Sequence, residues 1–131
     1  MSGTDKYLME WVHKAEEDYE AATTLIRKRK RPTPSAVCFH CQQCAEKYLK
    51  AFLVQQRVVF SKTHDLRELR RLVMTADPTF DLLTDLLLRL NPYAVEFRYP
   101  GEEATVEEAR DAVAAMKTVR RFVRGKLGLP E

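Results

Sequence analysis

Hydrophobic residues recur at every third or fourth position along most of this chain, the spacing that places them on one face of an α-helix. The first such segment covers about residues 5–26, and its apolar series is Leu8, Trp11, Val12, Ala15, Tyr19, Ala22 and Ile26. Acidic residues occupy the positions assigned to the polar side, namely Glu16, Glu17, Asp18 and Glu20. The pattern therefore predicts an amphipathic first helix.

A second helix is expected over about residues 36–56. Its apolar stripe comprises Val37, Cys41, Cys44, Ala45, Tyr48, Leu49 and Phe52. Residues 27–35 separate the two helices with five consecutive basic residues and two prolines. Because proline disrupts a helix interior, this stretch is predicted to be a basic loop, and Ser35 is placed to cap the second helix.

Two further helices follow after a short loop. The third is expected to begin at Thr63 or His64 and to end at the Asp77–Pro78 step, since the residue before a proline disfavours helix. The fourth carries apolar residues between positions 80 and 90 and ends before Pro92.

The last helix begins with a capping box, in which Thr105 is followed three residues later by Glu108, and it ends at Gly125 or Gly128. An aromatic loop over residues 91–104 precedes it. Five helices with short connections predict an all-α, five-helix up-and-down bundle in a single domain, residues 1–131.

Composition narrows the class of protein. The chain has 131 residues, of which 45% are hydrophobic and 31% charged, and only 4 are glycine, so it is globular and helix-rich rather than disordered or all-β. The net charge of +3 is too small to indicate nucleic-acid binding without a local cluster. Neither an export signal nor a membrane span is apparent, so we expect a cytoplasmic protein with no membrane association and with reduced thiols.

The stretch "CFHCQQC" places three cysteines and a histidine within seven residues, at positions 38–44. A structural zinc site usually takes further ligands from a distant pair, and the chain has no cysteine outside this cluster. On a helix Cys41 and Cys44 share a face, while Cys38 lies to one side. We therefore expect small buried apolar residues with no metal, and zinc binding is the alternative.

Four polar residues of the second helix also recur at steps of three and four: His40, Gln43, Lys47 and Lys50. They predict a row of donors that faces a ligand or a partner. The alternative is an ordinary solvated helix face.

Several motifs resemble one family. The segments "W..KAEEDYEAA", "CFHCQQCAEKYLKAFL", "THDLRELRRL" and "YAVEFRYPG" occur in the order found in the prokaryotic HEPN domain, and the resemblance covers about residues 7–122. It implies a bundle of four or five helices that forms a homodimer. It also implies a separate minimal nucleotidyltransferase as partner in a toxin–antitoxin-like pair, possible binding of nucleotide or RNA, and no metal or other cofactor.

Many members of that family are metal-independent ribonucleases with an arginine, four to six residues and then a histidine, usually near the start of the last long helix. Here the spacing is matched only by Arg57 and His64, which precede the third helix, whereas Arg98 has no histidine after it. We therefore favour a binding and interaction module without catalytic residues, and the alternative is a ribonuclease toxin that uses Arg57 and His64. The Thr63–His64 pair also suits an ordinary helix start.

The remaining candidates are Arg98 and Tyr99, in the long aromatic loop. A guanidinium next to tyrosine can pair with a phosphate while a ring stacks on a base. The predicted ligand-binding set is thus His40, Gln43, Lys47, Lys50, Arg98 and Tyr99. Alternatively, Tyr93, Phe97 and Tyr99 close one end of the bundle and Arg98 pairs with an acid.

Overall fold

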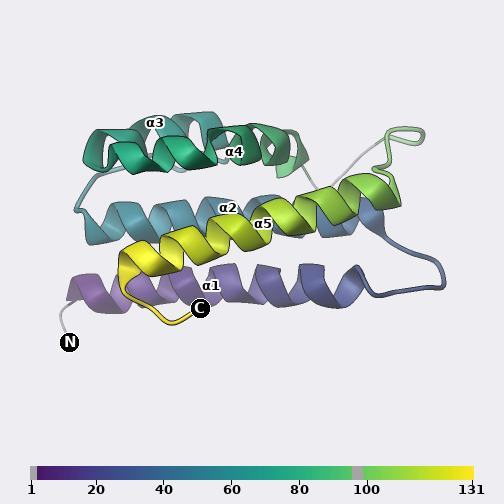
Figure 1. Cartoon of the computed structure of the whole chain (residues 1–131), viewed down its shortest axis with the longest axis horizontal. Helices are drawn as coiled ribbons and strands as arrows, with labels where there is room; N and C mark the ends of the chain where they lie inside the picture. The colour runs from purple at the N-terminus through teal and green to yellow at the C-terminus, as the bar shows by residue number, and fades with distance from the viewer. Residues whose placement is uncertain (1–2, 96–98) are drawn as a thin grey trace.

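The computed structural model describes residues 3–95 and 99–131. Within them lie five α-helices: α1 (Gly3–Leu25), α2 (Pro34–Gln55), α3 (Leu66–Ala76), α4 (Thr84–Leu90) and α5 (Val106–Leu127). Two short 3₁₀ helices flank α4, namely η1 (Pro78–Leu83) and η2 (Asn91–Ala94). No strand occurs in the described ranges. The predicted all-α bundle of five helices is confirmed (Figure 1).

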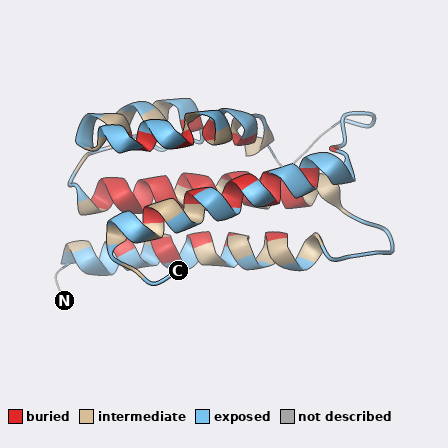
Figure 2. Cartoon of the chain, viewed as in Figure 1, coloured by how far each residue is buried: buried red, intermediate tan, exposed pale blue. Residues whose placement is uncertain are grey.

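Helix α2 is the central element of the bundle. It contacts α1, α3, α4 and α5, and 14 of its 22 residues are buried. Figure 2 shows burial on almost every turn of α2, whereas the other helices alternate between buried and exposed faces. The apolar stripe predicted for this helix is therefore only part of its buried surface.

Aromatic residues join the α3–α4 layer to the rest of the bundle. The Phe80 ring, from η1, lies 4.5 Å from the Phe52 ring of α2 and 5.0 Å from the Phe122 ring of α5, measured between centroids. Such pairs add to the hydrophobic gain from burying each ring. Phe80 is fully buried, so this 3₁₀ turn anchors the layer although it is not an α-helix.

The connection over residues 56–65 runs back beside α2. It carries Phe60 against Trp11 of α1, with ring centroids 6.1 Å apart, and brings His64 to Glu46 near the middle of α2. Helices α2 and α3 consequently point the same way, and α4 returns antiparallel to α3. The beginning and end of this α3–α4 hairpin meet where the Leu66 amide donates to Asn91 Oδ1 at 2.8 Å.

Helix ends match the predictions in part. The capping box of Thr105 and Glu108 is present, and Gly128 ends α5 with a φ of 76°, a left-handed conformation that glycine adopts without steric cost. The third helix begins later than expected, because Asp65 is its N-cap and accepts from the Arg67 amide at 2.9 Å. Thr33, not Ser35, is the N-cap of α2, and the Ser35 hydroxyl instead accepts from the Ala104 amide at 2.8 Å.

None of the helices in residues 3–95 and 99–131 is both long and apolar enough to cross a membrane.

Candidate functional site

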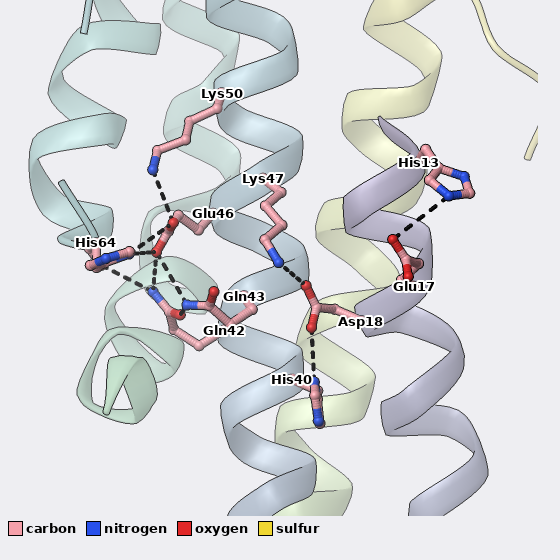
Figure 3. A network of polar contacts seen from close by, with 10 residues as sticks. All are labelled: His13, Glu17, Asp18, His40, Gln42, Gln43, Glu46, Lys47, Lys50 and His64. Carbon is pink, nitrogen blue, oxygen red and sulfur yellow. Dashed lines mark hydrogen bonds and ion pairs between the residues drawn. The ribbon is translucent and has the colours of Figure 1, made fainter. Parts of the chain in front are cut away.

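The predicted row of donors on α2 divides into two groups with different acceptors (Figure 3). The first acceptor is Asp18 of α1, which is buried. Its Oδ1 lies 2.8 Å from His40 Nδ1, and its Oδ2 accepts from Lys47 Nζ at 2.5 Å. The side chains of His40 and Lys47 keep 26% and 21% of their surface exposed, so this cluster opens to solvent at the α1–α2 seam.

The second acceptor is Glu46, whose side chain is only 2% exposed. Lys50 Nζ donates to its Oε2 at 3.0 Å, and His64 Nδ1 lies 3.1 Å from both carboxylate oxygens. Gln42 and Gln43 add longer contacts of 3.3 and 3.4 Å to Oε1. A buried carboxylate needs such partners, because an uncompensated charge in the protein interior costs several kcal/mol, to order of magnitude.

The loop before α3 is held by the same cluster. Gln42 Nε2 donates to the backbone oxygen of His64 at 3.0 Å, which fixes the main chain beside α2. Lys50 Nζ lies 5.3 Å from the centroid of the Trp11 ring and 6.0 Å from that of Phe60, distances that allow cation–π attraction. Lys50 is therefore a buried partner of Glu46 and does not present its ammonium group at the protein surface.

A third polar group joins α1, α2 and α5. Arg120 donates through Nε and Nη2 to the two oxygens of Glu16 at 2.8 and 2.7 Å, and the Tyr48 hydroxyl donates to Glu16 Oε2 at 2.5 Å. Arg124 Nη1 donates to the Tyr48 hydroxyl at 2.9 Å. Bidentate guanidinium–carboxylate pairs are among the stronger polar contacts, so this group fixes the three helices relative to one another.

The environment of this third group shifts its ionisation. Burial alone would raise the pKa of the Glu16 carboxyl, but hydrogen bonds from Arg120 and Tyr48 outweigh burial, so the pKa lies below its ordinary value. The pKa of Tyr48 is raised, first by burial and then by its bond to the Glu16 carboxylate. The carboxylate and the phenol are thus held in their charged and neutral forms.

All three cysteines of α2 lie in the protein interior. Cys38, Cys41 and Cys44 are all fully buried, as predicted for small apolar residues. Burial raises the pKa of the Cys41 thiol, and it raises that of Cys44 likewise. In the part of the chain that the structure describes, no group of three or more His, Cys, Asp or Glu residues is arranged to hold a metal ion.

Comparison with known proteins identifies the family. A family model described as "HEPN domain" matches residues 8–126, nearly the whole chain. The chain belongs to the HEPN family. A protein of Methanocaldococcus jannaschii named "Putative toxin MJ1304" is 29% identical over 147 residues, and the match covers 96% of this chain and 94% of that protein. The solved structure described as ST0689, an archaeal HEPN homologue, has the same fold, with a TM-score of 0.72, 22% identity and coverage of 91% and 96% of the two chains.

Arg57 and His64 occupy separate places in this HEPN domain. His64 lies beside Glu46, whereas Arg57 lies beyond the last residue of α2, Gln55, which is itself roughly 13 Å along the helix from Glu46. Arg57 has a φ of 58° and follows the end of α2, where its amide donates to the Val54 carbonyl and that of Val58 donates to the Leu53 carbonyl. These two bonds form a Schellman motif, in which Arg57 is the residue with left-handed conformation that ends the helix.

The aromatic loop of the HEPN domain is described in part. Arg98 lies outside the described residues. Tyr99 is 69% exposed, and its carbonyl accepts from the Glu102 amide at 3.0 Å in a tight turn. Tyr93 closes the neighbouring end of α4 and donates to Glu108 at 3.1 Å.

Sequence reasoning missed the acceptors of these groups. Asp18 was assigned to the polar side of the first helix, but it is buried there, and Glu16 is engaged by α5. The signal was available: Asp18 follows Ala15 by three residues and precedes Ala22 by four, so it belongs to the apolar series. Glu46 is four residues after Gln42 and four before Lys50, so the spacing alone places these three side chains on one face of the helix.

Proposed function

We propose that this chain is the HEPN half of a cytoplasmic toxin–antitoxin-like pair: a homodimeric interaction module that pairs with a separate minimal nucleotidyltransferase and binds nucleotide or RNA. The observation that carries the proposal is the similarity to the Methanocaldococcus protein named "Putative toxin MJ1304", over almost the full length of both chains. The match over most of both chains supports a shared architecture in the matched region.

Within this proposal, His40 and Lys47 are the ligand-contacting members of the α2 row. They share Asp18 as a common acceptor and remain partly exposed, so a ligand oxygen can compete for their protons. Gln43 and Lys50 are bound to Glu46 instead, and Lys50 is almost fully buried, so we place these two outside the direct contacts. Arg98 and Tyr99, from the loop before α5, remain proposed contacts.

Exposed apolar residues support self-association. Tyr7 is 49% exposed and Val59 is 91% exposed, and both line a hollow of about 440 Å³ together with Phe60. A second copy related by two-fold symmetry is the commonest way for a soluble protein to cover such a surface. Light scattering should give twice the 15.2 kDa mass of one chain. A mass of one chain at micromolar concentration would contradict the dimer.

Binding of labelled RNA tests the function directly. His40→Ala with Lys47→Ala should weaken binding, while Lys117→Ala, an exposed lysine of α5, serves as the control for lost charge. Co-expression with a minimal nucleotidyltransferase taken from the genomic neighbourhood of the chain should, if the pairing is right, yield a complex that survives gel filtration. Failure of both experiments would refute the proposal.

One observation favours a ribonuclease as the second candidate. The His64 ring is held through Nδ1 by buried Glu46, while 68% of its side chain is exposed, an arrangement suited to a general base oriented by a carboxylate. Arg57 of the same chain lies too far along α2 to join it, so a second copy would have to supply the arginine. RNA cleavage that is lost in both His64→Ala and Arg57→Ala would establish this alternative, and intact RNA would exclude it.

A further inference from the structure

A pocket of about 500 Å³ lies beside the basic loop. Its walls come from the end of α1, the loop over residues 27–33, the start of α2 and the first turn of α5. These segments meet at one end of the bundle (Figure 1). The floor is apolar and includes Ile26, Val37 and Ala109.

The charged residues that line the pocket are all cations. Arg27, Lys28 and Arg29 come from the loop and Arg110 from α5, and no carboxylate lines the pocket among the residues described. In the described ranges none of these four side chains makes an ion pair, whereas Arg120 pairs with Glu16 elsewhere on α5. Four neighbouring cations repel one another, and an anion between them would relieve that repulsion.

The loop that carries these cations is attached to the ends of both helices. The Arg27 amide donates to the Thr24 carbonyl at 3.2 Å and the Lys28 amide donates to the Leu25 carbonyl at 3.1 Å, so the first two basic residues continue the last turn of α1. The sequence alone predicted a basic loop, and the structure gives this part of the loop a defined main-chain path.

The start of α2 adds partial positive charge. Thr33 is the N-cap but its side chain makes no capping bond, and Pro34 has no N–H to offer. The N-terminus of this 22-residue helix is therefore uncapped at the pocket wall. In addition, the buried Thr33 Oγ1 has no hydrogen-bond partner in the described residues, so a donor beside the pocket is unused.

We propose that this pocket binds a terminal phosphate monoester joined to a flat or apolar body. A monoester carries about −1.5 to −2 charges at pH 7, which matches several cations better than the single charge of a carboxylate or of an internal phosphodiester. Three of the four cations are arginines, which pair with phosphate oxygens bidentately. The apolar floor receives the ring attached to the phosphate.

This inference rests on the proposed binding of nucleotide or RNA and states which part of such a ligand is recognised and where. A free nucleoside monophosphate and the phosphorylated end of an RNA present the same chemistry. The pocket also lies at a different place from the α2 row of His40 and Lys47, so the two sites can be tested separately.

Fluorescence anisotropy at fixed ionic strength provides the test, because salt alone alters such affinities. The probes are one labelled RNA hexamer with a 5′-phosphate, the same hexamer with a 5′-hydroxyl, and unlabelled AMP as competitor. The phosphorylated hexamer should bind about tenfold more tightly, the scale of one charge-assisted contact. Arg110→Gln should remove that preference, and Arg121→Gln, the identical change at an exposed position further along α5, should keep it.

Three other results would overturn the inference in recognisable ways. Equal binding of the two hexamers would refute the terminal-phosphate site and leave RNA binding in place. Displacement by a polyglutamate peptide but not by AMP would make the pocket a protein-docking surface. Binding of neither hexamer nor AMP would refute both this inference and the proposed ligand. Displacement of the hexamer by AMP indicates that a free nucleotide suffices, whereas its failure together with a phosphate preference assigns the pocket to RNA ends.

Discussion

Removing Lys50 should destabilise the protein strongly, because it leaves Glu46 buried without its ammonium partner. Lys50→Met preserves most of the side-chain volume and removes only the charge. Glu46 would retain His64 at 3.1 Å and the weaker contacts of Gln42 and Gln43. Loss of one member of a buried pair costs about 3–5 kcal/mol, and these remaining donors place the expected cost near the lower value.

Urea unfolding followed by far-ultraviolet circular dichroism measures this cost. A loss of about 3 kcal/mol should also lower the melting temperature by roughly 10 °C in a domain of this size. The double variant Glu46→Met with Lys50→Met should be less destabilised than Lys50→Met alone, because no buried charge is left unpaired. Arg71→Met removes an exposed ion pair with Glu68 and should leave the midpoint essentially unchanged.

Two results would contradict this account of Lys50 and Glu46. If Lys50→Met lies within about 1 kcal/mol of the parent, Glu46 is not held as a buried carboxylate that depends on Lys50. If the double variant loses as much stability as the two single variants together, the side chains contribute independently and the network argument is wrong.

Two further predictions concern ionisation. The pKa of Glu16 is lowered in the folded protein, so its contribution to stability is present above the ordinary carboxyl pKa and is lost as the pH falls through the lowered folded value. Acid unfolding should show this loss of stability below about pH 4.5. Arg120→Gln should reduce that part of the pH dependence. Because burial raises the thiol pKa of Cys41 and Cys44, the folded protein should react with a thiol reagent such as DTNB far more slowly than the urea-unfolded chain, and rapid reaction of the folded protein would show that the α2 core opens readily.

The sequence was sufficient to predict the five helices but not the contacts between distant residues that fix where a helix begins. Apolar periodicity located five helices, and capping chemistry located the start of α5 at Thr105. The third helix was expected to begin at Thr63 or His64, whereas Asp65 is its cap, and the Asn91 side chain, 26 residues away, helps to fix Asp65 there. A partner so distant in sequence cannot be identified from local spacing.

The candidate site shows the same limit more sharply. His40 and Lys47 were recognised as a polar row on the second helix, but their shared acceptor, Asp18, belongs to another helix. The periodicity of a sequence shows which residues share a helix face but not which element packs against that face. A row that faces a ligand and a row that is bonded inside the protein therefore have the same sequence pattern. Lys50 is the clearest example, because its long side chain would ordinarily be expected at the surface.

The meeting of Leu66 with Asn91 has a consequence for how the chain tolerates changes in length. The segment from residue 65 to residue 91 leaves and rejoins the bundle at one place, so its far turn near Pro78 is remote from both connections. Residues inserted just before Pro78 would leave both connections and the register of α1, α2 and α5 unaltered as long as Phe80 keeps its place against Phe52 and Phe122, and the entropic cost of a longer loop rises only slowly with its length. An insertion between residues 56 and 65 would instead displace Phe60 from Trp11 and His64 from Glu46. Natural length variation in related chains should therefore concentrate at the far turn of the hairpin and spare the connection beside α2.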